Sequence, residues 1–167
     1  HAETFERICK RYEAKMRQLN AVDFDDLLYL TVRLLQQNPA LLEIYQNRLR
    51  YILIDEYQDT NHLQYVLMRL LAGERCNVHV TGDPDQSIYS WRGADYRNIM
   101  DFVRDFPNAV VVKLEQNYRS TQNILEVANA VIQHNRERIE KNLFTENEPG
   151  AKVECRQLRD EKKEAEW

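Results

Sequence analysis

The hydrophobic and polar positions of this chain predict a group of helices followed by buried strands. Apolar residues recur at helical spacing over Ala2–Leu19, and a second helical stripe runs from Asp23, a candidate N-cap, to Pro39. Pro39 cannot continue that helix, and a third, short helix is expected from Pro39 to about Leu49. Tyr51–Ile54 is a continuous apolar run, typical of a strand buried on both faces of a parallel sheet.

The same alternation continues through the middle of the chain. Further apolar runs predict two more strands, Val78–Thr81 and Ala109–Leu114. Helical spacing predicts three more helices, over 63–71 with Gly73 closing it, over 99–106, and from about residue 121 onward. The repeated order of strand, polar loop and helix predicts an α/β fold, with a parallel sheet flanked by helices and ligands bound beyond the C-terminal ends of the strands.

Polar loops follow each of the three predicted strands. These loops carry Asp55–Glu56, Asp83–Gln86 and Tyr118–Arg119. Because the carboxyl ends of parallel strands meet at one edge of a sheet, we expect the three loops to converge. Carboxylates, amides and guanidinium groups are what a site for phosphate and metal requires, so the sequence predicts such a site at this edge.

Each of these side chains has a specific chemistry to offer. Asp55 can hold Mg²⁺, largely through water, and Glu56 can deprotonate a water for attack on a terminal phosphate. Arg92 and Arg119 each follow an aromatic residue. The planar guanidinium group of arginine stays protonated and can donate two hydrogen bonds to a transferring phosphoryl group. Tyr118 can stack on a nucleotide base. The alternatives are a solvated strand end for the acids and surface exposure without function for the Tyr118–Arg119 pair.

Tyr89 and Trp91 stand two residues apart on a stretch expected to be extended, which would place both rings on one side. Bases of single-stranded DNA stack on such rings at roughly 1 to 3 kcal/mol each. The alternative is that Trp91 is a core residue, although its polar neighbours Ser90 and Arg92 favour exposure.

Net charge and composition limit the binding partners that this chain is expected to have. The net charge of −4 over 167 residues argues against electrostatic binding of nucleic acid over the whole protein surface, so any DNA contact must be local. The apolar runs are only a few residues long, so we expect no membrane partner and a cytoplasmic location. The cysteines at 9, 76 and 155 are widely spaced and predict reduced thiols rather than a disulfide framework or a zinc site.

Four segments together resemble superfamily 1 DNA helicases of the UvrD/PcrA/Rep group. Asp55–Asn61 resembles motif II, the Walker B box, Gly82–Asp95 resembles motif III, and Gln116–Ser120 resembles motif IV. Asp23–Leu28 resembles the helix ahead of motif II. The resemblance implies a partial RecA-like P-loop NTPase fold and an ATP-dependent helicase that uses ATP and Mg²⁺, moves along single-stranded DNA and unwinds duplexes. It also implies junction DNA as a partner, with roles in DNA repair or replication.

The resemblance implies a role for each residue of the candidate site. On the nucleotide side, the implied roles are magnesium binding by Asp55, water activation by Glu56, sensing of the terminal phosphate by Gln86, linkage of that phosphate to Glu56 by Arg92, adenine stacking by Tyr118, and an arginine finger at Arg119. On the DNA side, Tyr89 and Trp91 would stack on the strand. The loop over 82–95 would therefore contact both ligands.

The sequence also departs from the family pattern. It contains no Gly-x-x-x-x-Gly-Lys-Ser/Thr loop, the Walker A motif that cradles nucleotide phosphates. In family terms we expect residues 1–20 to end an inserted helical subdomain, 21–113 to form the C-terminal half of the first RecA-like lobe, and 114–167 to start the second lobe. We therefore expect an internal piece of a helicase that neither hydrolyses ATP nor unwinds DNA alone.

Two alternative functions remain. A helicase-nuclease of the RecB/AddA type has related motifs, but it tends to carry phenylalanine where Tyr57 and Tyr118 stand. A catalytically dead, helicase-like interaction module is the other alternative. It would not need the intact hydrolytic set, which consists of Glu56, Gln86, Arg92 and Arg119.

Overall fold

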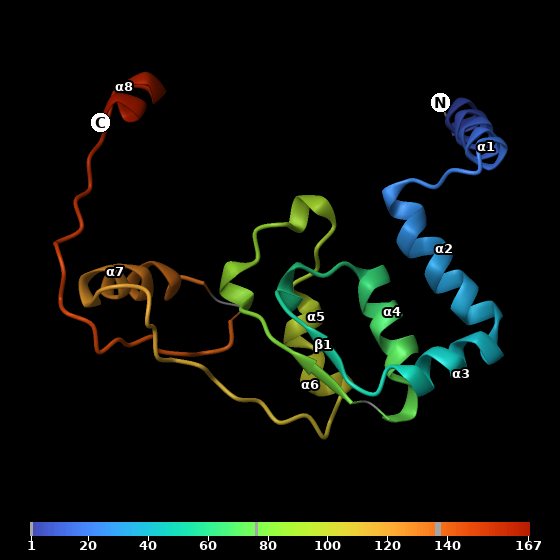
Figure 1. Ribbon diagram of the computed structural model, residues 1–167. Coiled ribbons are helices and arrows are strands. Elements are labelled where there is room, and N and C mark those ends of the chain that lie inside the picture. The colour runs from blue at the N-terminus through green and yellow to red at the C-terminus, as the bar shows by residue number, and fades with distance from the viewer. Residues whose placement is uncertain (1, 76, 136–137) are drawn as a thin grey trace. The chain divides into compact units, whose positions relative to one another are not determined.

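The computed structural model describes residues 2–75, 77–135 and 138–167, and the chain divides into two compact units, His1–Pro107 and Asn108–Trp167. The helices and strands of the first unit are α1 (Ala2–Gln18), α2 (Phe24–Gln37), α3 (Pro39–Arg48), β1 (Ile52–Ile54), α4 (His62–Ala72), β2 (Val78–Val80), α5 (Arg97–Met100) and α6 (Phe102–Asp105) (Figure 1). The second unit contains α7 (Gln122–Ile132) and α8 (Glu161–Glu166). Cys9 and Cys155 are free thiols, and Cys76 lies outside the described residues.

The three predicted opening helices are confirmed, with ends within a residue or so of those expected. Asp23 caps α2 through a reciprocal pair of hydrogen bonds, in which its Oδ1 accepts from the backbone N–H of Asp26 at 2.8 Å and its N–H donates to Asp26 Oδ2 at 3.4 Å. Tyr12 also donates to Asp23 Oδ2 at 2.7 Å. The Asp26 N–H, followed by the Tyr12 hydroxyl, lowers the pKa of Asp23.

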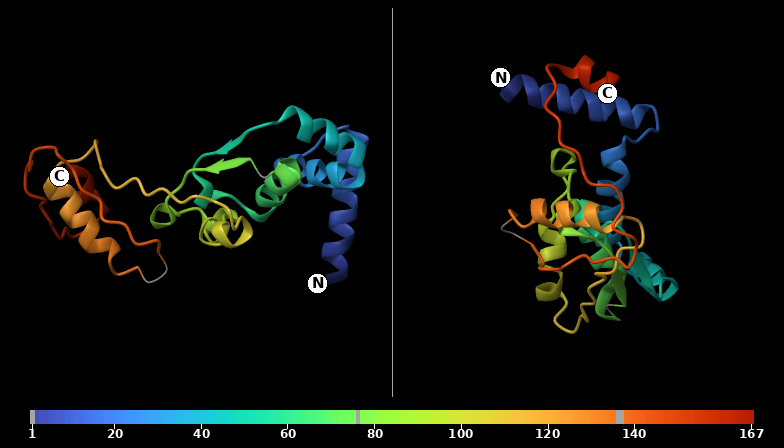
Figure 2. Two further views of the ribbon diagram at one scale, coloured as in Figure 1. Left: turned by 90° about the horizontal axis from the view of Figure 1, so that it is seen from below. Right: turned by 90° about the vertical axis from the view of Figure 1, so that its left-hand side faces the viewer.

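The sheet is a parallel pair in which Ile52 lies opposite Val78 and Ile54 opposite Val80. Figure 2 shows β1 and β2 side by side in its left view. Helix α4 makes the crossover that parallel strands require. Asn61 caps the start of α4, and Gly73 ends it at φ 53°, a conformation that a side chain would strain. The predicted strand, helix and strand are thus confirmed for this part of the chain.

Helices α2 and α4 pack together, and the buried residues on them are Val32 and Leu35 of α2 and Met68 and Ala72 of α4. Strand β1 does not match the expectation of burial on both faces, because Leu53 is 74% exposed while its neighbours are half-buried. Side chains of a strand alternate between the two faces of the sheet, so β1 has one covered and one open face.

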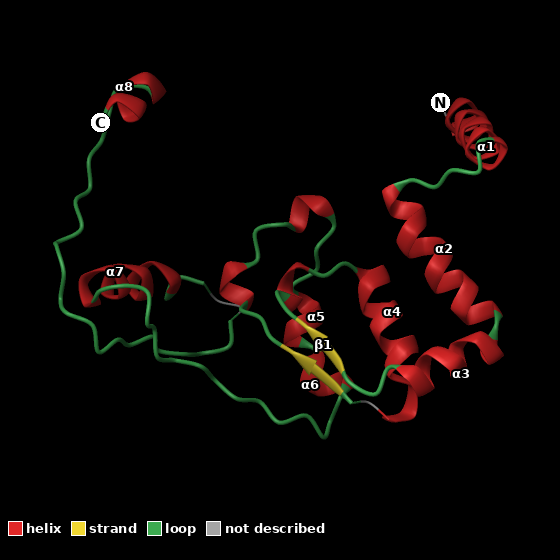
Figure 3. Ribbon diagram, in the orientation of Figure 1, coloured by secondary structure: helices red, strands yellow, loops and turns green. Residues whose placement is uncertain are grey.

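The predicted strand Ala109–Leu114 is wrong for this structure, which has loop over that segment (Figure 3). Val110 and Val112 are 87% and 72% exposed. A valine run favours a strand only when a neighbouring strand accepts its hydrogen bonds, and the described residues of 109–114 have no strand partner. The predicted helix over 99–106 forms as two short helices, α5 and α6, interrupted at Asp101.

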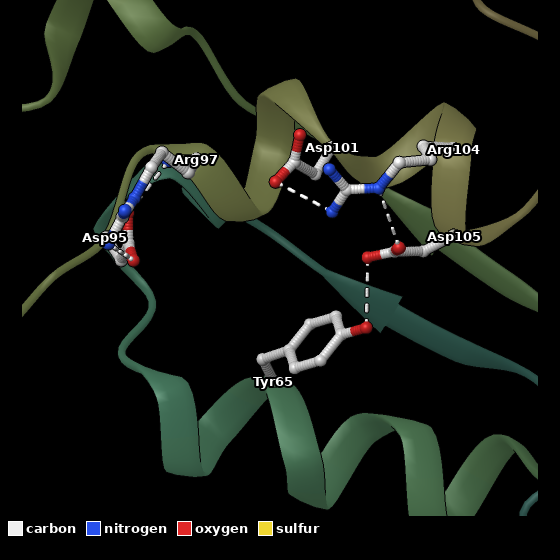
Figure 4. A network of polar contacts seen from close by, with 6 residues as sticks. All are labelled: Tyr65, Asp95, Arg97, Asp101, Arg104 and Asp105. Atoms are coloured by element: carbon white, nitrogen blue, oxygen red, sulfur yellow. Dashed lines mark hydrogen bonds and ion pairs between the residues drawn. The ribbon is translucent and has the colours of Figure 1, made fainter.

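Polar contacts fix α6 against α4, as Figure 4 shows. Tyr65 donates to Asp105 Oδ2 at 2.9 Å, and Arg104 pairs with both Asp101 and Asp105. Burial and the hydrogen bond to Asp105 raise the pKa of Tyr65. No helix in the described part of the chain combines the length and apolarity needed to cross a bilayer.

Candidate nucleotide and DNA site

The backbone after β1 turns sharply at the first candidate carboxylates. Glu56 has φ 50° and ψ 43°, in the left-handed region, which costs a residue with a side chain about 1–3 kcal/mol. Hydrogen bonds hold this turn. Glu56 N–H donates to Asp55 Oδ1 at 2.9 Å, and Tyr57 N–H then donates to the carbonyl of Thr81 at 3.0 Å. The second bond attaches the turn directly to the end of β2. Strain of this kind is concentrated at functional sites, and here it falls on the predicted general base.

Gln58 joins the loops that follow β1 and β2. Its side chain is 1% exposed, and its Nε2 donates to Glu56 Oε2 at 2.8 Å. Its Oε1 accepts from the backbone N–H of Asp83 at 2.9 Å. The structure therefore brings the first two of the three predicted loops together. Sequence reasoning gave Gln58 no role, although an amide amid the acids of its motif was an available signal.

The loop after β2 passes very close to Gln58. A Cβ on Gly82 would lie 2.6 Å from Gln58 Oε1 and 3.1 Å from the backbone nitrogen of Tyr57, so only glycine fits there without displacing its neighbours. Asp83 then caps the short 3₁₀ helix Pro84–Gln86, with its Oδ1 accepting from the Asp85 N–H. Gln86 is exposed and donates from Nε2 to Asp83 Oδ2 at 2.7 Å. Its sensing of a phosphate stays a prediction.

The aromatic pair lies on a tight turn, so the expected extended stretch is wrong. Ser90–Arg92 is a 3₁₀ helix, yet the rings of Tyr89 and Trp91 still lie together, with centroids 6.5 Å apart and planes tilted by 50°. Trp91 is 74% exposed, which excludes a core tryptophan in this structure. The guanidinium carbon of Arg92 lies 4.6 Å from the Trp91 centroid and 5.0 Å from that of Tyr89. The link from Arg92 to Glu56 stays a prediction.

The far end of this loop also returns to the turn after β1. Ala94 forms an antiparallel bridge with Asn61, and the N–H of Asp95 donates to the carbonyl of Thr60 at 3.0 Å. Asn98 Nδ2 donates to the same carbonyl at 3.0 Å. The segment over 84–93 is therefore attached at both ends to one turn, which carries Glu56.

Tyr118 and Arg119 lie in the second unit, in a loop organised by Asn117. Asn117 Oδ1 accepts from the backbone N–H groups of Arg119 at 2.9 Å and Ser120 at 2.8 Å. Tyr118 is 79% exposed, and its hydroxyl donates to Gln116 Oε1 at 2.9 Å. Both side chains are accessible to a ligand, and their convergence with Glu56 stays a prediction. Sequence reasoning missed the role of Asn117, for which the tendency of asparagine to close such turns was the signal.

Comparison with known proteins identifies the family. The model of the UvrD/REP helicase N-terminal domain matches residues 1–107. The chain belongs to the UvrD/REP helicase family. The UvrD-like helicase C-terminal domain matches residues 112–167, so two consecutive domains of these helicases are represented. Membership in the UvrD/REP helicase family implies a RecA-like α/β fold, with which the parallel pair β1–β2 and its crossover helix agree.

The chain is similar to proteins named "ATP-dependent DNA helicase PcrA". It is 52% identical over 151 residues to the one from Leuconostoc citreum. The aligned residues make up 90% of this chain and 20% of that protein. It is 48% identical over all 167 residues to the one from Staphylococcus epidermidis strain RP62A, covering 23% of that protein. A Staphylococcus aureus protein is 47% identical over the same span. The chain thus spans about a fifth of the length of these curated relatives.

The acids of this UvrD/REP chain fit a magnesium ion that takes most of its ligands from water and phosphate. Among the residues described, no group of three or more His, Cys, Asp or Glu side chains is arranged to hold a metal. Asp55 offers an exposed carboxylate directly after β1, and Mg²⁺ is commonly bound through one or two carboxylates plus substrate phosphates. Magnesium binding by Asp55 stays a prediction.

Proposed function

We propose that this chain is part of a longer ATP-dependent DNA helicase, which hydrolyses ATP with Mg²⁺, moves along single-stranded DNA and unwinds duplex and junction DNA. The observation that carries the proposal is the hydrogen-bonded connection from Glu56 through Gln58 to the loop that exposes Tyr89 and Trp91. Family membership and the names of the curated relatives support it. A cytoplasmic location and a role in DNA repair or replication belong to the same proposal.

The nucleotide would bind beyond the ends of β1 and β2. Asp55 would hold Mg²⁺ there, and the ion would neutralise charge on the phosphates. Glu56 would orient and deprotonate the attacking water, because the left-handed turn presents its exposed carboxylate just past the sheet edge. Gln86 would contact the terminal phosphate through the amide that now donates to Asp83.

Three other candidate residues would contribute to the site. Arg92 would leave its position over the two rings to reach the terminal phosphate, where its fork donates two hydrogen bonds. Tyr118 would stack on adenine with its exposed ring, while Arg119 would act as the arginine finger. The turn built by Asn117 supports this pair, because it fixes the backbone of Arg119 and leaves both side chains accessible.

The DNA strand would bind at Tyr89 and Trp91. Base stacking on aromatic rings is independent of sequence, which suits a motor that moves along any strand. Stacking also suits a chain with a net charge of −4, because it does not depend on a broad positive surface. Movement of the loop over 84–93, attached at both ends to the turn with Glu56, would then couple hydrolysis to displacement of a base.

We further propose that residues 1–20 end an inserted helical subdomain, 21–113 belong to the first RecA-like lobe and 114–167 start the second. The division of the structure after Pro107 and the family matches ending at 107 and beginning at 112 support a lobe boundary in this region. The loop with Tyr118 and Arg119 would then belong to the second lobe.

The 167-residue chain alone is expected to neither hydrolyse ATP nor unwind DNA, because its sequence has no Walker A loop to hold the phosphates. Phosphate release measured with and without single-stranded DNA, beside a strand-displacement assay, checks this. Turnover that disappears in the Glu56→Gln variant of the same chain would show that a nucleotide can be held without that loop.

Single-stranded DNA is expected to quench the fluorescence of Trp91 in this chain, because the ring is exposed beside Tyr89. A Trp167→Phe background removes the other tryptophan, so that titration with an oligothymidylate reports on Trp91 alone. In the matched control, Trp91→Phe with Trp167 intact, the signal should remain constant. If the fluorescence of Trp91 stays constant at millimolar nucleotide concentrations, the proposal that DNA binds at Tyr89 and Trp91 is contradicted.

A further inference from the structure

Gln58 is a buried polar side chain whose hydrogen bonds lead to the candidate site. It is 1% exposed, and its amide group donates to Glu56 and accepts from the backbone of Asp83. A weaker contact of 3.5 Å joins Nε2 to Asp59 Oδ2. Burying an amide is costly unless its donors and acceptors find partners, and here those partners are the predicted general base and the loop after β2.

The chemistry of the partners fixes which way round this amide lies. A carboxylate oxygen only accepts hydrogen bonds, so Nε2 must face Glu56, and a backbone N–H only donates, so Oε1 must face Asp83. A flipped amide would set an oxygen against the Glu56 carboxylate and an NH₂ group against an N–H. Gly82 closes the space on the other side, since even a Cβ there would lie 2.6 Å from Oε1. Gln58 is therefore held in one orientation.

We propose that Gln58 is a positioning residue that orients the Glu56 carboxylate for water activation and couples it to the loop carrying Tyr89, Trp91 and Arg92. The inference rests on the proposed function of Glu56 as the general base. Glu56 lies on an exposed, left-handed turn, and the bond from Gln58 fixes one of its carboxylate oxygens. Through Asp83 N–H, the same side chain fixes the start of the loop, so a change at Glu56 is transmitted to the loop.

The test compares two variants of Gln58 in the full-length protein, with DNA-stimulated ATP hydrolysis as the assay. Gln58→Ala removes both hydrogen bonds and should lower kcat roughly 10- to 100-fold, because a misplaced catalytic group loses that much. KM for ATP should remain within about 3-fold, since a positioning residue does not bind the substrate. Gln64→Ala is the matched control: Gln64 caps α4 through Asn61 and is expected to leave kcat unchanged.

Gln58→Glu is nearly isosteric and tests the contact with Glu56 directly. It keeps the acceptor for Asp83 but sets a second carboxylate beside Glu56, and two adjacent carboxylates share a proton. This variant should therefore lower kcat at least as far as Gln58→Ala does, although the volume of the side chain is kept.

Normal kcat in Gln58→Ala contradicts the proposal, as does a KM for ATP that rises in parallel with the fall in kcat. If Gln58→Glu does not fold because it buries a carboxylate, kcat and KM of Gln58→Ala decide the proposal. Failure of the underlying function looks different. If Glu56→Gln retains hydrolysis, Glu56 is not the general base, whereas loss in Glu56→Gln together with normal Gln58 variants rejects the positioning role alone.

Discussion

Replacing Glu56 with glutamine in the full-length protein is expected to lower kcat for DNA-stimulated ATP hydrolysis by about 10²- to 10⁴-fold. The substitution keeps the size of the side chain and the left-handed turn, but an amide cannot accept a proton from the attacking water. Nucleotide binding should be retained, because the phosphates would be held by other groups. Single-turnover hydrolysis and binding of a fluorescent ATP analogue separate these two effects.

Glu43→Gln is the matched control for this prediction. Glu43 lies exposed on α3, and its replacement by glutamine removes the same charge at a position outside the candidate site. Its kcat should equal that of the unaltered protein. Retention of normal hydrolysis by Glu56→Gln would remove the general base from the account, and loss of nucleotide binding would mean that Glu56 acts in binding rather than in proton transfer.

Tyr57→Ala should destabilise the 167-residue chain by about 3–5 kcal/mol, the range for removing a large buried ring. Tyr57 is fully buried, and its ring meets that of Phe102 edge-on, with centroids 5.6 Å apart. Because Tyr57 directly follows Glu56, loss of the ring should also make the turn at Glu56 less ordered. Urea unfolding followed by circular dichroism measures the change in the free energy of unfolding.

Tyr57→Phe is the control, because it keeps the ring and removes a hydroxyl that is buried and makes no hydrogen bond with the described residues. It should cost less than about 1 kcal/mol or stabilise the chain. Burial raises the pKa of Tyr57 to about 12, so the stability that the phenol contributes is lost as pH rises from about 10 to 12, and the variant should lack this loss. Equal costs for both substitutions would show that the ring does not support the fold.

The sequence predicted the elements that local chemistry determines. Asp23 as an N-cap predicted the start of α2, Gly73 predicted the end of α4, and Pro39 predicted the start of α3. The apolar runs at β1 and β2 gave a parallel pair, as the helix between them required. The predicted meeting of their polar loops followed from that topology and is confirmed for the first two loops.

Features that depend on distant partners were not predictable from local pattern. Ala109–Leu114 has the composition of a strand, but pairing decides whether one forms, and here the segment is loop. Tyr89 and Trp91 come together through a 3₁₀ turn rather than an extended segment. The role of Gln58 depends on its contact with Asp83, which is 25 residues away, and no spacing in the sequence reveals that contact.

The most direct test of the central claim is a crystal structure of the full-length protein with a non-hydrolysable ATP analogue, Mg²⁺ and single-stranded DNA. The claim is that the loops after the strands surround one nucleotide. The predicted result has Glu56 facing the water next to the terminal phosphate, Gln86, Arg92 and Arg119 donating to phosphate oxygens, and Tyr118 stacked on adenine. Glu56, Gln86 and Arg92 pointing into separate regions, with the nucleotide bound elsewhere, would contradict it.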